Sequence, residues 1–217
     1  MSKEKSENAI SEKENTSVAV PSAFIEDANS GLETLTAEDI TIPRLKVLQA
    51  MSPEVMKSDG KYVEGASAGD IINTVTGKLY TNDNPLVALP VAYKRLFLEW
   101  GPRESGGGLV AQHEDASILS KTTKDNMGRD MLENGNYIQT SATHFVLSLN
   151  EDGSYDSAMI AMAGTQLKKS RTWNSVMASI KMRSGDKVFT PASFSHKYVM
   201  KTKAESNDRG TWFGWNI

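Results

Sequence analysis

The sequence has no cysteine among its 217 residues, and aromatic residues make up only 7% of it. The absence of cysteine excludes disulfide frameworks and thiolate metal sites, and it is typical of proteins in a reducing cytoplasm. No apolar run approaches the roughly 20 residues that a membrane-spanning helix needs. Residues 1–17 also lack the apolar segment of a secretory signal peptide. We therefore expect a soluble, cytoplasmic protein that does not act at a membrane.

Residue types that carry catalysis are scarce as well. The three histidines, His113, His144 and His196, are far apart and lack the spacing of metal ligands. The sequence has no cysteine, and we expect no nucleophile elbow, so we identify no candidate nucleophile for acyl transfer. We read Gly65–Gly69 as a turn of small residues. The protein is therefore expected not to be an enzyme and to need neither a cofactor nor a bound metal.

Acidic residues leave one catalytic alternative open. A magnesium-dependent nuclease could use four acids together with Lys94 or Lys168, although nothing in their spacing favours such a site. The four acids are Asp70, Glu99, Glu151 and Asp152. A nuclease is therefore the least favoured of the functions considered.

Positive charge is concentrated in one stretch of the chain. Residues 168–203 contain nine lysines or arginines and one acid, Asp186, so this stretch carries +8 in a chain whose total is −3. The remaining residues therefore sum to −11. Although most basic runs are ordinary solvated surface, charge this segregated predicts a surface that faces a polyanion. The nine residues are Lys168, Lys169, Arg171, Lys181, Arg183, Lys187, Lys197, Lys201 and Lys203.

Aromatic residues lie among these cations. Cations that neutralise phosphates beside rings on which bases stack are the two parts of a groove for single-stranded nucleic acid. Trp173, Tyr198, Trp212 and Trp215 compete for the stacking role. Trp173 shares the apolar arc of a predicted helix and is expected in the core. Trp212 and Trp215 are three positions apart, so in a strand they face opposite sides and only one can line the groove.

The N-terminal part differs in composition from the rest. Residues 1–37 are acidic, rich in Ser, Glu, Lys and Asn, and poor in large apolar side chains, so we predict a disordered tail. Thr36 and Asp39 resemble the start of a helix, and residues 70–80 predict a hairpin with its turn near Gly77. We predict a single domain over 38–217 in which 38–82 forms an N-terminal extension.

Five further strands and one helix are predicted from the hydrophobic periodicity. The helix, at 166–182, has a basic outer face and lies between the third and fourth strands, which is the connectivity of the OB-fold, a β-barrel that binds oligonucleotides. Pro90 implies an edge position or a bulge. Residues 109–135 form a long connection with a short helix near 113–119, and 204–210 form a polar loop. The strands are predicted at 86–100, 137–149, 157–162, 194–203 and 211–216.

The chain also shows a resemblance to phage proteins. The segments IPRLKVLQ, GDIINTVTG, VALPVAYKRLFLEWGPRESGGG, TQLKKSRTWNS and GTWFGW resemble small replication-module proteins of tailed bacteriophages, which are similar to OB-fold single-stranded DNA-binding proteins. The resemblance covers about 40–217. It implies action on DNA in replication or recombination, in the cytoplasm of the host cell. Such proteins often end in an acidic tail, whereas here the acidic segment is N-terminal.

These observations lead to one favoured function and one alternative from another class. We expect a sequence-nonspecific single-stranded DNA-binding protein. Its acidic N-terminal tail could recruit phage replication proteins. The protein could also form a homo-oligomer. The alternative is a structural or interaction protein whose basic face binds an acidic protein. The predicted nucleic-acid-binding residues are Lys94, Arg95, Arg103, Lys168, Lys169, Arg171, Lys181, Arg183, Lys197, Tyr198, Lys201, Lys203, Trp212 and Trp215.

Overall fold

The computed structural model describes residues 25–102, 104, 106–208 and 210–217. The predicted disorder of residues 1–24 and the predicted site residue Arg103 therefore lie outside the described residues. The chain divides into two units, Met1–Ile40 and Thr41–Ile217. In the described part of the first unit, the Asp39 carboxylate accepts from the backbone N–H and the hydroxyl of Thr36, at 2.9 and 2.7 Å. This contact closes a turn, and the helix predicted there does not form.

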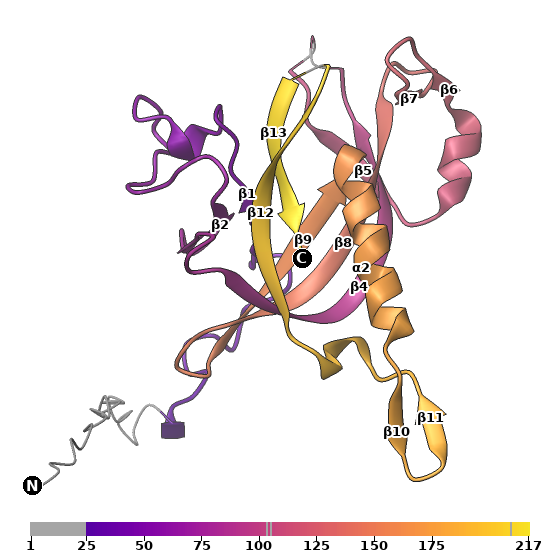
Figure 1. Cartoon of the computed structure of the whole chain (residues 1–217). Helices are drawn as coiled ribbons and strands as arrows, with labels where there is room; N and C mark the ends of the chain where they lie inside the picture. The colour runs from indigo at the N-terminus through magenta and orange to yellow at the C-terminus, as the bar shows by residue number, and fades with distance from the viewer. Residues whose placement is uncertain (1–24, 103, 105, 209) are drawn as a thin grey trace, which may run out of the picture. The chain divides into compact units, whose positions relative to one another are not determined.

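The second unit is mainly β, with the α-helix α2 (Leu167–Ser179) and short 3₁₀-helices at Pro53–Val55, Ala116–Lys121, Gly164–Gln166 and Ser193–Ser195. Its strands form three sheets (Figure 1), of which the largest has the order β13-β12-β4-β8-β7-β6, with β5 paired to β4 and β9 paired to β8. The strands are β1 (Leu45–Val47), β2 (Ile71–Asn73), β3 (Leu79–Tyr80), β4 (Leu86–Trp100), β5 (Leu109–His113), β6 (Thr123–Lys124), β7 (Asp130–Met131), β8 (Tyr137–Leu149), β9 (Tyr155–Ala163), β10 (Met182–Ser184), β11 (Lys187–Phe189), β12 (Tyr198–Asn207) and β13 (Gly210–Asn216). No described helix is long and apolar enough to cross a membrane.

Strand β4 organises the large sheet. Its first residues pair with β12, almost all of its residues from Val87 onward pair with β8, and its last residues pair with β5. The register with β8 shifts between Pro90 and Ala92, which confirms the bulge predicted at Pro90, since proline has no N–H for the ladder. The hairpin of β2 and β3 is also confirmed, and Gly77 in its turn has a positive φ of 71°.

The prediction of a mainly β domain with a helix after the third strand is confirmed, but the large sheet is not closed into a barrel. In OB-fold connectivity the third and fifth strands would pair, and here these are β9 and β13, which share no ladder. Other groups occupy both edges. Gln49 donates to the Phe213 carbonyl at 2.9 Å and accepts from its N–H at 2.8 Å, and the N–H of Met159 donates to the Pro43 carbonyl. The segment 43–49 therefore contacts both β9 and β13, the two strands that would pair directly in a closed barrel.

Helix α2 packs over this sheet. Trp173 and Ser170 are its buried residues, and Trp173 joins a core cluster with Met200, Trp215 and Ile160. The helix ends at Ser179, before the predicted end at 182, because Met182–Ser184 pairs with Lys187–Phe189 in a separate two-stranded sheet. This hairpin extends away from the large sheet (Figure 1).

Three further boundaries differ from the prediction. The strand expected at 194–203 begins at Tyr198, because Ser193–Ser195 forms a 3₁₀-helix. The polar loop expected at 204–210 is mostly strand, since Asn207 pairs with Gly210. Within the connection 109–135, the short helix lies at Ala116–Lys121 and is flanked by three short strands.

Candidate nucleic-acid interface

A groove of about 470 Å³ runs between α2 and the strands β12 and β13. We call it the large groove, because it is the larger of the two grooves that flank α2. Its helix side has cations at Lys168 and Lys169, and its strand side has the ring of Tyr198 and the buried ring of Trp215. The lining residues are Thr165, Lys168, Lys169, Thr172, Trp173, Val176, Tyr198, Glu205, Trp215, Asn216 and Ile217. The groove therefore brings together five of the residues that the sequence singles out for nucleic-acid binding or stacking.

A second, smaller groove of about 200 Å³ lies on the other flank of α2. We call it the small groove. At 100° per residue, its helix residues Leu167, Ser170 and Arg171 lie on the side of α2 opposite Lys169 and Val176 of the large groove. From the sheet it is lined by Tyr93, Arg95, Thr140 and Ala142. Arg95 and Arg171 are exposed, and among the described residues no acid pairs with either.

A row of rings connects the two grooves beneath the helix. The centroids of Tyr93 and His144 are 5.0 Å apart, those of His144 and Trp173 are 4.4 Å apart, and those of Trp173 and Tyr198 are 5.5 Å apart. The two inner rings are buried, whereas Tyr93 is 39% exposed and Tyr198 is half-buried. Each groove therefore has a tyrosine at its edge whose position is fixed by the packed rings behind it.

His144, in the middle of this row, is fully buried and uncharged. Burial lowers its pKa to about 4. Its Nε2 is 2.8 Å from the Ser170 hydroxyl, while its Nδ1 and the Trp173 Nε1 find no partner among the described residues. His144 thus positions the rings and the helix, and at neutral pH it contributes no charge that could attract an anion.

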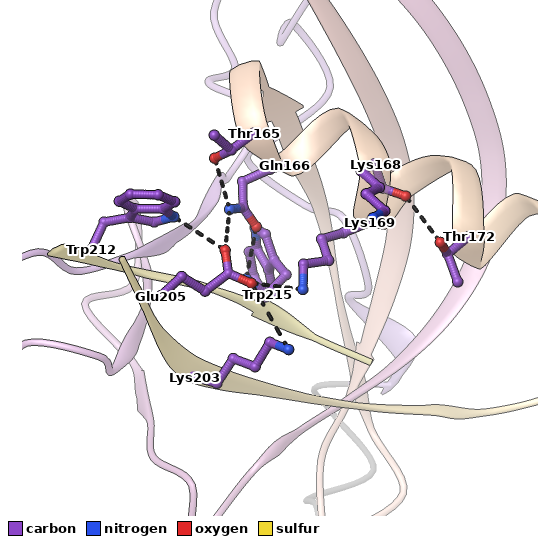
Figure 2. A network of polar contacts seen from close by, with 9 residues as sticks. All are labelled: Thr165, Gln166, Lys168, Lys169, Thr172, Lys203, Glu205, Trp212 and Trp215. Atoms are coloured by element: carbon purple, nitrogen blue, oxygen red, sulfur yellow. Dashed lines mark hydrogen bonds and ion pairs between the residues drawn. The ribbon is translucent and has the colours of Figure 1, made fainter. Parts of the chain in front are cut away.

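The large groove also contains an acid, Glu205 (Figure 2). Its carboxylate accepts from Lys169 at 2.7 Å and lies 3.9 Å from the Lys203 ammonium. It also accepts from Trp212 Nε1 at 3.1 Å and from Gln166 Nε2 at 3.3 Å. The hydrogen bond from Lys169 lowers the pKa of Glu205, and the same bond raises the pKa of Lys169. Two predicted phosphate ligands are therefore ion-paired in the free protein.

The other predicted residues lie apart from these grooves. Lys94 pairs with Glu114 at 2.6 Å, and Lys181 donates to the Thr190 hydroxyl at 2.5 Å. Arg183 is exposed on the β10–β11 hairpin, and Lys201 is half-buried on β12. Lys197 lines a different recess, which it shares with Lys78 and Asp152.

Two residues that line these grooves are not among the residues predicted from the sequence. Tyr93 directly precedes Lys94 and Arg95 on β4 and lines the small groove. An aromatic residue next to two basic residues in a predicted strand is the sequence pattern that could have indicated a stacking residue. Glu205 lies two residues beyond the basic stretch and was left out of its charge balance. Its contact with Lys169 joins residues 36 positions apart, so only the fold reveals it.

Three of the four acids of the nuclease alternative take part in local contacts. Glu99 accepts from Asn136 at 2.6 Å and lies 2.9 Å from His113 Nε2, and the hydrogen bond from Asn136 is the main reason why its pKa is lowered. Asp70 accepts from the Ser67 N–H, and Asp152 from the Ser154 hydroxyl. Within the described residues, no three His, Asp or Glu side chains form a group suited to a metal ion.

The segment Gly65–Gly69 resembles a nucleophile elbow in its residue spacing only. It has the Gly-x-Ser-x-Gly spacing of a nucleophile elbow, centred on Ser67. Such an elbow joins a strand to a helix. Here Ser67 is exposed in a loop that leads into β2, and no described histidine bonds to its hydroxyl. The spacing is present, but the geometry of an elbow is not.

Comparison with protein families shows which family the chain resembles. The profile of the family described as Pam3 phage gp34-like protein matches residues 12–217. No curated protein and no solved structure matches the chain.

Proposed function

This chain belongs to the Pam3 phage gp34-like protein family, and from that premise we propose that it serves a phage as a sequence-nonspecific single-stranded DNA-binding protein. One observation carries the proposal. On each flank of α2, a cation that no described acid pairs with lines the same groove as a tyrosine ring: Lys168 with Tyr198 in the large groove, and Arg171 with Tyr93 in the small groove.

The arrangement suits a flexible strand of nucleic acid. Lys168 and Arg171 lie on the outer side of α2, so phosphates of one strand that crosses the helix could contact both. A base in either groove could stack on the tyrosine there, and each stacked base would contribute about 1–3 kcal/mol. Every base has a face that stacks, so this mode of binding discriminates little between sequences. We place this activity in phage DNA replication or recombination.

The first experiment measures the anisotropy of a labelled oligothymidine at several salt concentrations. We expect saturable binding by the wild-type chain, preferred over a duplex of equal length. The double variant Lys168→Ala, Arg171→Ala should bind about tenfold more weakly, because it loses two phosphate contacts. The slope of log affinity against log salt should fall in magnitude by about 1.4.

The matched control removes the same charge elsewhere. Lys57 and Lys61 are exposed and line neither groove, so Lys57→Ala, Lys61→Ala should leave affinity and slope near the wild-type values. Equal losses in both double variants would mean that overall charge, and not the face of α2, determines binding. If the oligothymidine stays intact when it is incubated with the protein and magnesium, the result would favour binding over the nuclease alternative.

The β10–β11 hairpin supports the alternative function, which is binding to an acidic protein. The β10–β11 hairpin exposes Met182, Val188 and Phe189 beside Arg183 and Lys187. Apolar side chains exposed together beside cations also suit an acidic protein partner. No binding of single strands at low salt, together with capture of an acidic phage protein, would favour that function.

A further inference from the structure

The carboxylate of Glu205 divides its contacts between two kinds of donor. One oxygen, Oε1, faces the ammonium groups of Lys169 and Lys203. The other, Oε2, faces the uncharged N–H groups of Trp212 and Gln166. The side that faces the lysines has the geometry of an anion bound between two cations, and Glu205 and Lys169 line the large groove.

We propose that Glu205 is an internal competitor for phosphate, which a bound strand must displace from Lys169 and Lys203 before these lysines contact it. This inference rests on the proposed function. The carboxylate would therefore set a threshold: a single phosphate gains little by replacing it, whereas a strand that also contacts Lys168 and Tyr198 in the same groove can do so.

The surroundings of Glu205 are suited to this exchange. The side chains of Lys169 and Lys203 are 26% and 50% exposed, so phosphate can reach both ammonium groups from solvent. Trp212 and Gln166 can continue to hold Oε2 when the lysines turn away, because they donate to an atom that the lysines do not contact in the structure. The acid thus has an anchor that does not depend on the lysines.

Glycine at position 214 makes room for the competitor. A Cβ at Gly214 would lie 2.5 Å from Glu205 Oε2 and 2.7 Å from Gln166 Nε2. Gly214→Ala would therefore push the carboxylate away from its anchor without removing any charge. This variant separates the position of Glu205 from its charge.

The test compares Glu205→Gln with wild type by anisotropy of labelled oligothymidine across a salt series. The amide cannot form ion pairs, so both lysines become free for phosphate. We expect binding about fivefold tighter and a salt slope steeper by about 0.7 for each lysine released. Glu133→Gln is the matched control, since Glu133 is exposed, has no ion pair among the described residues and changes the net charge equally.

A double-mutant comparison adds a readout that a merely structural role would not change. Lys169→Ala should cost more affinity in the Glu205→Gln background than in wild type, because only there is Lys169 free before binding. Gly214→Ala should shift affinity in the same direction as Glu205→Gln.

The possible failures can be told apart. A folded Glu205→Gln variant that binds as the wild type does, or more weakly, would overturn the inference and leave the proposed function standing. An equal gain in Glu133→Gln would overturn it too, since net charge would then suffice. If neither wild type nor Glu205→Gln binds single strands at low salt, the proposed function itself fails and the inference fails with it.

Discussion

At the scale of single residues, His144 makes the stability of the domain depend on pH. Burial lowers its pKa to about 4, whereas an unfolded histidine titrates near 6.5. As the pH falls from 6.5 to 4, the unfolded chain gains a proton that the folded chain does not. Folding should therefore lose about 3 kcal/mol across this window, and the loss is absent above pH 7. Urea unfolding followed at half-unit pH intervals measures it.

Two histidine variants test this assignment. His144→Gln should be less stable at pH 7 but nearly insensitive to pH between 6.5 and 4.5, because the titrating ring is gone. His196→Gln should keep the wild-type profile, since His196 is exposed. The lowered pKa values of Glu99 and Glu205 also weaken folding in acid, and this loss begins as the pH falls into the usual range of carboxyl groups. The part of the profile above that range therefore reports on His144 alone among these three groups. A wild-type profile that is flat from 6.5 to 4.5 would contradict the burial of His144.

At the scale of elements, the long apolar strands could be predicted and the short polar ones could not. β4 and β8 have the predicted bounds, because runs of branched and aromatic residues end at clear turn residues. The sequence predicts a loop over 204–207 because both faces of that segment carry polar or small side chains, and only pairing with β13 makes it part of strand β12. The end of α2 was placed too late because its apolar spacing continues to Ile180, while hairpin pairing takes over at Met182.

The same distinction applies to the site. Lys168, Arg171 and Tyr198 can be proposed as site residues from the sequence, because charge and aromatic content are local properties of the chain. Which cations remain free depends on pairs between distant residues, such as Lys169 with Glu205 and Lys94 with Glu114. Such pairs are set by the strand register and by the position of the helix, which local sequence does not encode.

The β10–β11 hairpin is an element whose role can be separated from folding. All residues from 181 to 190 are exposed, and the two strands pair only with each other. Replacing 182–189 by Gly-Ser-Gly should therefore leave the melting temperature within about 2 °C of wild type. It removes Arg183 and Lys187, so affinity for oligothymidine should fall several-fold if the strand extends along the hairpin.

The control for this change keeps the hairpin and removes its charge. Arg183→Gln, Lys187→Gln should reproduce the loss of affinity if the two cations act on phosphate. Loss of affinity only on deletion would assign the effect to Phe189 and its apolar neighbours instead. Unchanged affinity in both variants would remove the hairpin from the interface.

At the scale of the whole molecule, the segment before β4 belongs to the fold and is not an accessory to it. Leu45, Ile71 and Tyr80 lie in the main core cluster and are at most 4% exposed. Gln49 satisfies both backbone groups of Phe213 on the edge strand β13. A sheet that is not closed into a barrel leaves two edges, and the segment 43–49 covers parts of both. The part called an extension in the sequence analysis thus replaces the missing strand pairing.

This leads to a prediction about truncation. Removing the three core side chains Leu45, Ile71 and Tyr80 would cost roughly 5–9 kcal/mol of apolar burial, which is comparable to the whole stability of a typical domain. A chain beginning at residue 83 should therefore fail to unfold cooperatively in thermal circular dichroism, although it contains all five strands and the helix of the predicted OB-like arrangement. A chain beginning at Thr41 should melt cooperatively, within a few degrees of the full chain, because the second unit begins there. A cooperative transition in the shorter chain would mean that the five strands close upon themselves when the bridging segment is absent.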